Sequence, residues 1–490
     1  MKNTLLLSLS NILMRLCALA FQAYLAAKIG PGQLGVFGII TSVGMVFATI
    51  SISGVRFSVT RLVAEEVSKQ NEYPKGLMCC AFRYGSLFGL VSGVGMYFLS
   101  DVLSTSYIGD AGAVAALRIM SFSMPAISLG ACVEGYFSAK QKVFRLVTVQ
   151  TISQLLRIAF VVCGFGAFLD KGAYPSDILA AGHLVGEGSF AVFLFLLYLP
   201  EIYKKKDNGK GENYFPALVK TAMPLAVSAY MRTGLSSLGQ VIIPAGLKKS
   251  GMGSVGAFSV YGVITQMAMP VVMFPSALLA AMGNILIPRL TEAQVKKQKI
   301  GISYIVNRSL RIGAMFSFGI MGVMLFFANG LAQAIYKNSE AAIYIRLFAP
   351  LIPVIYIDCV TDGCLKGLGQ QVYSMMYNVF EGIINVVLLF FLLPRMAMTG
   401  YILVMYIKEV FNATLSIRRL TFVTSVDVSA GVLMSVSLCT LGAGAVSRIL
   451  TFPCVWANVI IYLCSYGLLL YVLNTVTRDD IRWVRTLIKQ

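Results

Sequence analysis

Four arginines lie within, or at the end of, long apolar runs, where a charged side chain is costly to place. Arg15, Arg157 and Arg232 fall inside such runs, and Arg56 falls near the end of another. A guanidinium group is a planar fork of donors that forms paired hydrogen bonds with phosphate oxygens. These four are therefore candidate substrate-binding residues for an anionic group. The alternative is that each reaches the membrane interface or pairs with a nearby carboxylate, and Arg56 is also interpretable as an ordinary inner-loop cation.

Four further polar side chains in apolar runs could couple transport to an ion. They are Asp358, Asp362, Glu381 and Asn385. Each pair is four residues apart, so its members share one helix face. Carboxylate and amide oxygens suit a hard cation such as Na⁺, and carboxylates also carry protons. We therefore expect a coupling site for Na⁺ or H⁺, with capping or pairing to Lys366 and Arg346 as the structural alternative.

Two other pairs of intramembrane charges have simpler interpretations. His183 and Glu187 are four residues apart and could form a proton site, but a satisfied structural pair is the favoured interpretation. Lys408 and Glu409 are adjacent, so they point in different directions on a helix, and we expect them to serve separate partners.

The composition identifies a polytopic membrane protein. The 490 residues are 57% hydrophobic and 12% charged, whereas a soluble protein has about 25% charged residues. The formal charge of +19 reflects Lys and Arg gathered in alternate loops, so no nucleic-acid partner is expected. The 10 cysteines lie mostly in apolar runs and show no metal-binding spacing.

The apolar runs predict an all-α fold of about fourteen transmembrane helices, since a span needs about 20 apolar residues. The expected spans cover residues 5–27, 34–55, 77–99, 113–137, 144–168, 178–199, 217–245, 256–287, 308–328, 341–365, 372–393, 399–417, 428–447 and 454–474. Four prolines in the seventh and eighth runs predict kinks or breaks there. They are Pro224, Pro244, Pro270 and Pro275.

The loops predict the domain organisation and the orientation. A polar stretch, Y-K-K-K-D-N-G-K-G-E-N from Tyr203 to Asn213, is the one clear linker. We expect an N-terminal lobe (1–202), a cytoplasmic linker (203–215), a C-terminal lobe (216–420), and two final helices with a basic tail (421–490). Basic residues concentrate in the loops after helices 2, 4, 6 and 8 and in the tail, which predicts that both termini are cytoplasmic.

One stretch of the chain occurs twice. Leu34-Gly35-Val36-Phe37 matches Val255-Gly256-Ala257-Phe258, and the apolar run after each copy ends in an Arg-Leu pair followed by a glutamate. Two related halves in a membrane are typical of a transporter with a cleft between them.

The sequence offers little for catalysis. It contains neither G-x-x-x-x-G-K-[ST] nor His-Glu-x-x-His, and its polar stretches are too short to hold a soluble catalytic domain. We expect no enzyme activity, no catalytic residues and no cofactor apart from a coupling ion.

The repeated stretch also carries a resemblance. K-I-G-P-G-Q-L-G-V-F-G at 28–38, followed by S-V-T-R-L-V-A-E-E at 58–66, resembles the start of the stage V sporulation protein B family of polysaccharide-biosynthesis membrane proteins. Further stretches agree in order: Gly135-Tyr136-Phe137 with S-Q-L-L-R at 153–157, M-A-M-P-V-V-M-F-P-S-A-L with I-P-R-L, Lys366–Gln370, and Leu393-Pro394 with Gly400-Tyr401.

The resemblance implies the multidrug/oligosaccharidyl-lipid/polysaccharide exporter superfamily, with two six-helix lobes around a central cleft and a polyprenyl-pyrophosphate-linked saccharide as cargo. Arg15 and Arg56 correspond by helix to arginines in the cleft of the related lipid II flippase. Two positions depart from the family pattern, which has a proline or small residue at Arg56 and a glutamate at Ser153. Cargo contacts at these positions are therefore expected to differ.

The leading hypothesis is a flippase for such a lipid-linked saccharide, monomeric, in a bacterial cytoplasmic membrane, with cell-wall or polysaccharide synthesis enzymes as partners. One alternative is a cation-coupled multidrug exporter, which should have acids where helices 1–5 offer mainly Arg15 and Arg157. The other is a membrane scaffold without transport, in which interior arginines would be replaceable.

Overall fold

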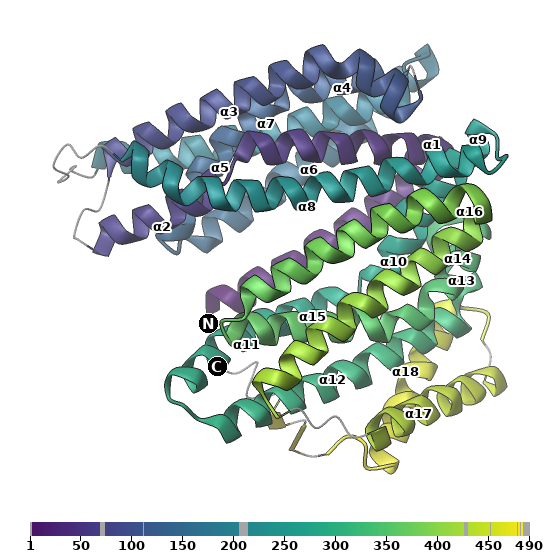
Figure 1. Cartoon of the computed structure of the whole chain (residues 1–490). Coiled ribbons are helices and arrows are strands. Elements are labelled where there is room, and N and C mark those ends of the chain that lie inside the picture. The colour runs from purple at the N-terminus through teal and green to yellow at the C-terminus, as the bar shows by residue number, and fades with distance from the viewer. Residues whose placement is uncertain are drawn as a thin grey trace. The chain divides into compact units, whose positions relative to one another are not determined.

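The computed structural model describes residues 2–68, 74–110, 112–204, 214–425, 430–450, 452–477, 479–480 and 482–483. The regular structure in these ranges is helical throughout (Figure 1). This confirms the predicted all-α class, and it follows from the apolar runs, because a helix satisfies its own backbone hydrogen bonds inside lipid.

The helices of the first half are α1 (Lys2–Ile52), α2 (Val55–Ser68), α3 (Lys75–Val102), η1 (Leu103–Ile108), α4 (Ala113–Ser121), α5 (Ser123–Ala139), α6 (Val143–Phe168), η2 (Leu169–Lys171), α7 (Pro175–Lys204) and α8 (Phe215–Lys249). Those of the second half are α9 (Ser254–Gly262), η3 (Val263–Ala268), α10 (Met269–Met273), α11 (Ser276–Val295), α12 (Lys299–Phe326), α13 (Ala328–Tyr336), α14 (Glu340–Phe348), η4 (Ala349–Leu351), α15 (Ile352–Gly367), α16 (Gln371–Val423), α17 (Ala430–Ile449) and α18 (Val455–Val472).

Each of the fourteen predicted spans overlaps one of these helices. Eleven helical segments of the described chain are long and apolar enough to cross a membrane. Two of them, Ile12–Ser68 and Gln371–Val423, contain two predicted spans each, divided at the non-helical residues Gly30 and Ala397. The remaining predicted span corresponds to α8.

The internal repeat is visible in the backbone. Gly30 and Gly251, which are 221 positions apart, both have positive φ, at 73° and 97°. Glycine adopts this conformation without the cost that a Cβ imposes. The helix of the first copy is next interrupted by a turn at Ser53-Gly54, and that of the second copy by a turn at Phe274-Pro275. These two turns have the same separation in sequence as the two glycines. The two copies therefore break their helices at equivalent positions, and the break at Pro275 lies in the run where prolines predict one.

Helix α2 forms where the sequence predicts only a cationic loop. Val55, Val59 and Val63 are buried against α5, while Arg61 and Glu65 pair on the exposed side. Apolar residues four apart lie on one face of a helix, and this amphipathic pattern explains why the segment is helical.

The packing contacts divide the chain into two compact units. Unit 1 comprises Met1–Pro31 and Ala245–Gln490, and unit 2 comprises Gly32–Pro244. The first part of α1 thus packs in unit 1, where Gln22 Nε2 donates to Gln266 Oε1 at 2.6 Å. Most of α8 packs in unit 2. The units therefore group helices differently from the lobes predicted by chain order, whose boundaries stay a prediction, and most of the 203–215 linker lies outside the described residues.

Three glycines of α3, spaced four residues apart, bring that helix close to α5 and to the end of α4. A Cβ added at Gly85 would lie 2.9 Å from Cys132 Sγ, one at Gly89 would lie 3.0 Å from Pro125 Cα, and one at Gly93 would lie 2.9 Å from the Ser121 carbonyl oxygen. These glycines therefore serve close helix packing.

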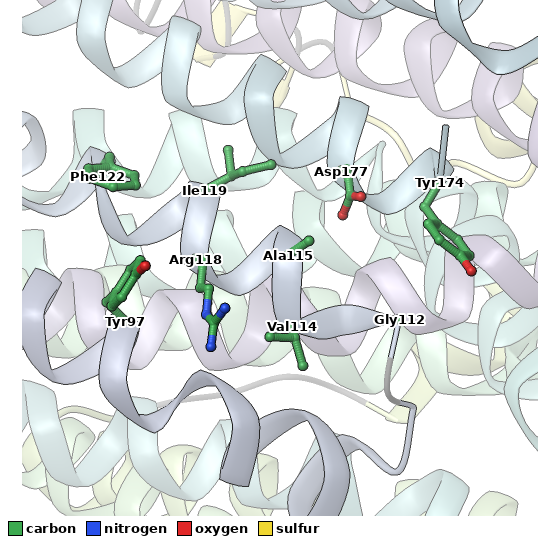
Figure 2. A pocket seen from close by; sticks show the side chains of 9 residues that line it. All are labelled: Tyr97, Gly112, Val114, Ala115, Arg118, Ile119, Phe122, Tyr174 and Asp177. Carbon is green, nitrogen blue, oxygen red and sulfur yellow. The ribbon is translucent and has the colours of Figure 1, made fainter. Parts of the chain in front are cut away.

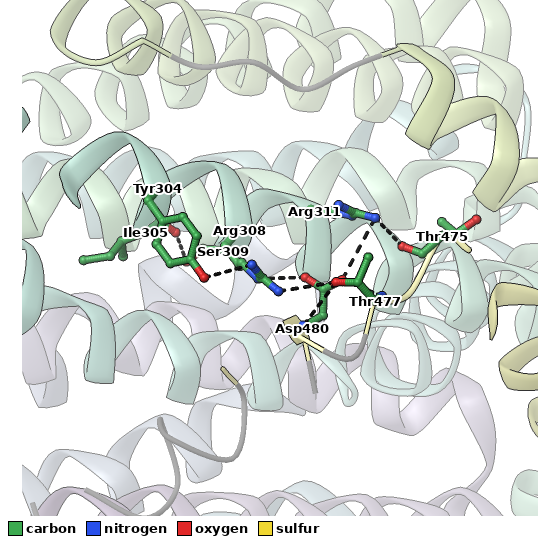
Figure 3. Close-up of polar contacts among 8 residues, drawn as sticks. All are labelled: Tyr304, Ile305, Arg308, Ser309, Arg311, Thr475, Thr477 and Asp480. Atoms are coloured by element: carbon green, nitrogen blue, oxygen red, sulfur yellow. Dashed lines mark hydrogen bonds and ion pairs between the residues drawn. The ribbon is translucent and has the colours of Figure 1, made fainter. Parts of the chain in front are cut away.

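An ionic contact fastens the segment after α18 to α12 (Figure 3). Asp480 is buried, and its carboxylate lies 2.7 Å from Arg308 Nε and 4.0 Å from Arg311 Nη2. Thr477 donates both its backbone N–H and its hydroxyl to Asp480 Oδ2, at 2.8 and 2.7 Å. An acidic residue thus holds the segment after α18 against α12. The sequence indicates only that this segment is a basic tail.

The packing of α18 on α12 leads to a first prediction. A Cβ added at Gly322 of α12 would lie 1.8 Å from Tyr462 Oη in α18, whereas a Cβ at Gly467 would meet nothing within 4 Å. Gly322→Ala is expected to destabilise the protein by about 1–3 kcal/mol, because Tyr462 must move. Thermal unfolding of the purified protein measures this, with Gly467→Ala as the matched control. Equal melting temperatures for the two variants would contradict it.

Candidate functional site

Two of the four predicted arginines have no polar partner in the part of the chain that the structure describes. Arg15 of α1 is exposed and lies within electrostatic range of Tyr356 and Cys359 in α15. Arg232 of α8 is also exposed. Neither forms an ion pair or a hydrogen bond with a described residue. Their guanidinium donors are therefore available to a ligand.

Arg232 owes its position to the packing of α8 on the second part of α1. Ser42 Oγ donates to Ser237 Oγ at 3.1 Å, and Tyr230 Oη donates to Ser53 Oγ at 2.6 Å. These contacts hold one face of α8 against α1. Because successive helical residues turn by about 100°, Arg232 projects away from that face.

Arg56, by contrast, already has a carboxylate partner. Its Nη1 lies 3.1 Å from Glu134 Oε1 of α5, and its guanidinium lies 4.9 Å from the centre of the Phe57 ring. The structure thus shows Arg56 in the alternative arrangement, a pair within its own unit.

Arg157 forms no ion pair or hydrogen bond with a described residue, but a carboxylate interacts with it electrostatically. Its stem packs against Gly186 of α7, where an added Cβ would lie 3.1 Å from Arg157 Cβ. Glu187, the next residue, interacts electrostatically with Arg157, and so does His183. His183 and Glu187 therefore belong to a three-residue charge group with Arg157.

The predicted acidic residues lie in α15 and α16 of unit 1, and Glu381 is bound to a lysine. Lys408 Nζ lies 3.0 Å from Glu381 Oε1 and 2.9 Å from Glu409 Oε1. The prediction that Lys408 and Glu409 serve separate partners is wrong. The lysine side chain is long enough to reach both carboxylates, although its backbone neighbour starts about 100° around the helix.

Asp358 has no cationic partner among the described residues. Asn412 Nδ2 donates to Asp358 Oδ2 at 3.0 Å, while Asp358 Oδ1 is buried and has no hydrogen-bond partner. A buried carboxylate that lacks a counter-charge is costly in lipid surroundings. Asp358 is therefore suited to receive a cation or a proton.

The other predicted members of the coupling site do not share the unpartnered carboxylate of Asp358. Asp362 is bound by Lys366 Nζ at 2.5 Å and by the Ser374 hydroxyl, which is the predicted structural alternative. Asn385 makes no hydrogen bond to these acids within the described ranges. The described residues contain no group of three or more His, Cys, Asp or Glu side chains arranged to hold a metal ion.

The acidic residues of the α15–α16 group outnumber its lysines. If all are ionised, Lys366 neutralises Asp362, and Lys408 neutralises one of Glu381 and Glu409. Two negative charges are left in the α15–α16 group, one of them on Asp358. Asn412, which sequence reasoning missed, belongs to this group, and its position one turn after Lys408 is the signal that could have revealed it.

A second cluster that the sequence analysis missed surrounds Glu201 of α7. This buried carboxylate lies 3.6 Å from Lys140 Nζ and 3.2 Å from Arg145 Nη1, and it also binds Lys142. These cations are recognised in the sequence only as a basic loop. The cluster thus brings three cations and one buried carboxylate together at one end of unit 2.

Known proteins resemble this chain over nearly its whole length. The family model described as polysaccharide biosynthesis protein matches residues 1–294, and the one described as MatE matches residues 250–391. Stage V sporulation protein B of Bacillus subtilis (strain 168) is 22% identical, over 98% of this chain and 97% of its own. These matches confirm the resemblance inferred from the glycine and proline motifs.

Solved structures show the same fold. The inward closed conformation of lipid II flippase MurJ aligns with a TM-score of 0.75 at 16% identity, covering 97% of this chain and 100% of its own. An inward-facing multidrug resistance MATE family transporter of the MOP superfamily aligns with a TM-score of 0.63 at 12% identity, covering 84% and 97%. The protein is thus a multi-pass membrane protein with the fold of these transporters.

Proposed function

The chain belongs to the polysaccharide biosynthesis protein family, and from this premise we propose that it is a flippase. Its cargo is an anionic polyprenyl-pyrophosphate-linked saccharide, which it moves across the cytoplasmic membrane by alternating access. Stage V sporulation protein B and lipid II flippase MurJ, which resemble it in sequence and in fold respectively, support this proposal.

One observation carries the proposal, namely the free guanidinium groups of Arg15 and Arg232. A buried or lipid-facing arginine normally has a partner. Arg56 has an ion pair with Glu134, and Arg157 interacts electrostatically with Glu187. Arg15 and Arg232 have none among the described residues. A pyrophosphate offers oxygens for paired, charge-assisted hydrogen bonds with such groups, which are the stronger kind of hydrogen bond.

Transport by proteoliposomes tests the proposal. The purified protein should move a fluorescent undecaprenyl-pyrophosphate saccharide between leaflets faster than protein-free liposomes do. No acceleration, together with extrusion of a cationic dye, would replace this proposal with drug export. Acceleration of neither compound would favour the scaffold without transport.

Export of organic cations is the second candidate, and the unmatched acid Asp358 favours it together with the MatE match over residues 250–391. A cation site needs carboxylates that lack partners, and Asp358 is one. The free cations Arg15 and Arg232 oppose it, because they repel a positively charged cargo.

Asp358 is also the proposed coupling residue, taking up Na⁺ or H⁺. Asp358→Asn is expected to remove the dependence of flipping on the coupling gradient. The amide keeps the shape of the side chain, but it has no negative charge to bind Na⁺ and does not take up a proton. Flipping measured with and without Na⁺ or proton gradients gives this dependence. Asp362→Asn is the matched control, since Asp362 is already bound by Lys366. Gradient dependence that persists in Asp358→Asn would contradict the role.

A further inference from the structure

A cavity of about 640 Å³ lies within unit 2, and none of the arginines and acids discussed above lines it (Figure 2). It forms where the end of α3, the start of α4 and the start of α7 meet. Nine residues line it, and they are Tyr97, Gly112, Val114, Ala115, Arg118, Ile119, Phe122, Tyr174 and Asp177. The volume is in the range of pockets that hold small organic ligands.

The lining combines aromatic rings with a carboxylate oxygen that has no partner. Asp177 Oδ1 is buried and forms no hydrogen bond with a described residue. Tyr97 and Phe122 meet edge to face with centroids 6.1 Å apart, and Tyr174 is 63% exposed at the other side of the cavity. A buried acceptor without a donor costs free energy, so a ligand that donates a hydrogen bond to Asp177 would be stabilised here.

The charged residues that line the cavity limit the class of ligand that it can bind. Arg118 is already bound, with Nη2 2.8 Å from Asp101 Oδ2 and Nε 3.1 Å from Ser100 Oγ. Its charge is thus compensated, whereas Asp177 has no cationic partner in the part of the chain that the structure describes, and the pocket therefore disfavours an anion such as pyrophosphate. The same guanidinium lies 5.3 Å from the centre of the Tyr97 ring, so the ring face that would attract a cationic ligand is already occupied.

We propose that this pocket binds the neutral saccharide part of a glycan. Sugar hydroxyl groups donate to the free Asp177 oxygen, and the apolar faces of a pyranose ring pack on Tyr174 and Phe122. The pocket lies at the opposite end of α7 from the basic Glu201 cluster, and the charge bias of the loops predicts that this end faces outward. The inference takes the bound glycan to be part of the cargo, and in this respect it rests on the proposed function.

Binding of a soluble glycan to the full-length protein in nanodiscs tests the inference without any transport step. The probe is N,N′-diacetylchitobiose, titrated by saturation-transfer NMR. Wild type should bind it, and Asp177→Asn and Tyr174→Ala should each weaken binding at least about tenfold. Phe168→Ala, which removes an exposed ring of α6 outside the pocket, should bind as wild type does.

Three results would overturn the inference. They are no binding by wild type, equal binding by wild type and both pocket variants, and displacement of the disaccharide by tetraphenylphosphonium, which would assign the pocket to organic cations. Flipping measured on the same preparations separates the two proposals. Flipping without disaccharide binding removes this site and leaves the flippase, whereas disaccharide binding without flipping removes the flippase and leaves the site.

Discussion

Arg15→Ala and Arg232→Ala are each expected to lower the flipping rate of a polyprenyl-pyrophosphate saccharide roughly 10- to 100-fold. This range corresponds to losing a hydrogen bond to a charged group, about 1.5–3 kcal/mol. The reason is structural, because neither guanidinium has a described partner that would otherwise use its donors. Proteoliposome flipping at equal protein incorporation measures the effect.

The paired arginines provide the contrast. Arg56 is bound to Glu134 and Arg157 is next to Glu187, so replacing either should change flipping only a few-fold once folding is verified. Arg61→Ala is the matched control, since Arg61 is an exposed arginine of α2 whose Nε already pairs with Glu65 Oε1. If all five variants lost flipping to the same extent, the distinction between free and paired arginines would be wrong.

Asp480→Asn is expected to destabilise the protein by about 3–5 kcal/mol, the usual cost of removing one partner of a buried ion pair. Asp480 is 4% exposed, and its loss would leave the partly buried Arg308 and Arg311 of α12 without their carboxylate. The segment after α18 should detach and α18 should become accessible. A lower melting temperature and faster proteolysis after residue 472 would report both effects.

The neighbouring acid is a close control for this prediction. Asp479 is 71% exposed in its side chain and lies 3.8 Å from the equally exposed Arg482. Surface pairs of this kind contribute about 0–1 kcal/mol. Asp479→Asn should therefore melt and resist protease as wild type does. Identical behaviour of the two variants would show that the Asp480 contact does not stabilise the fold.

The number and order of the spans are predictable from the sequence, because apolar length is a local property. The repeat is also predictable, and the positive φ at Gly30 and at Gly251 shows its physical basis. Helix α2 is not predicted in this way, because its positive charges indicate a loop and hide the buried face formed by its valines.

The partners of the intramembrane charges are harder to predict from the sequence. Arg56 and Glu134 are 78 positions apart, and Asp358 and Asn412 are 54 apart. Such pairs depend on how helices pack and not on any local pattern. Lys408 and Glu409 are neighbours, yet their pairing depends on the side-chain rotamers that the packed helices select.

The measurement that tests the central claim most directly combines a change in the cargo with a change in the protein. Flipping of an undecaprenyl-pyrophosphate saccharide is compared with that of a neutral prenyl glycoside of the same sugar, for wild type and for the Arg15→Ala/Arg232→Ala double variant. If the free arginines hold the pyrophosphate, wild type prefers the anionic cargo strongly, and the double variant loses most of that preference. An equal preference in both proteins would contradict the account, since the pyrophosphate would then be recognised elsewhere.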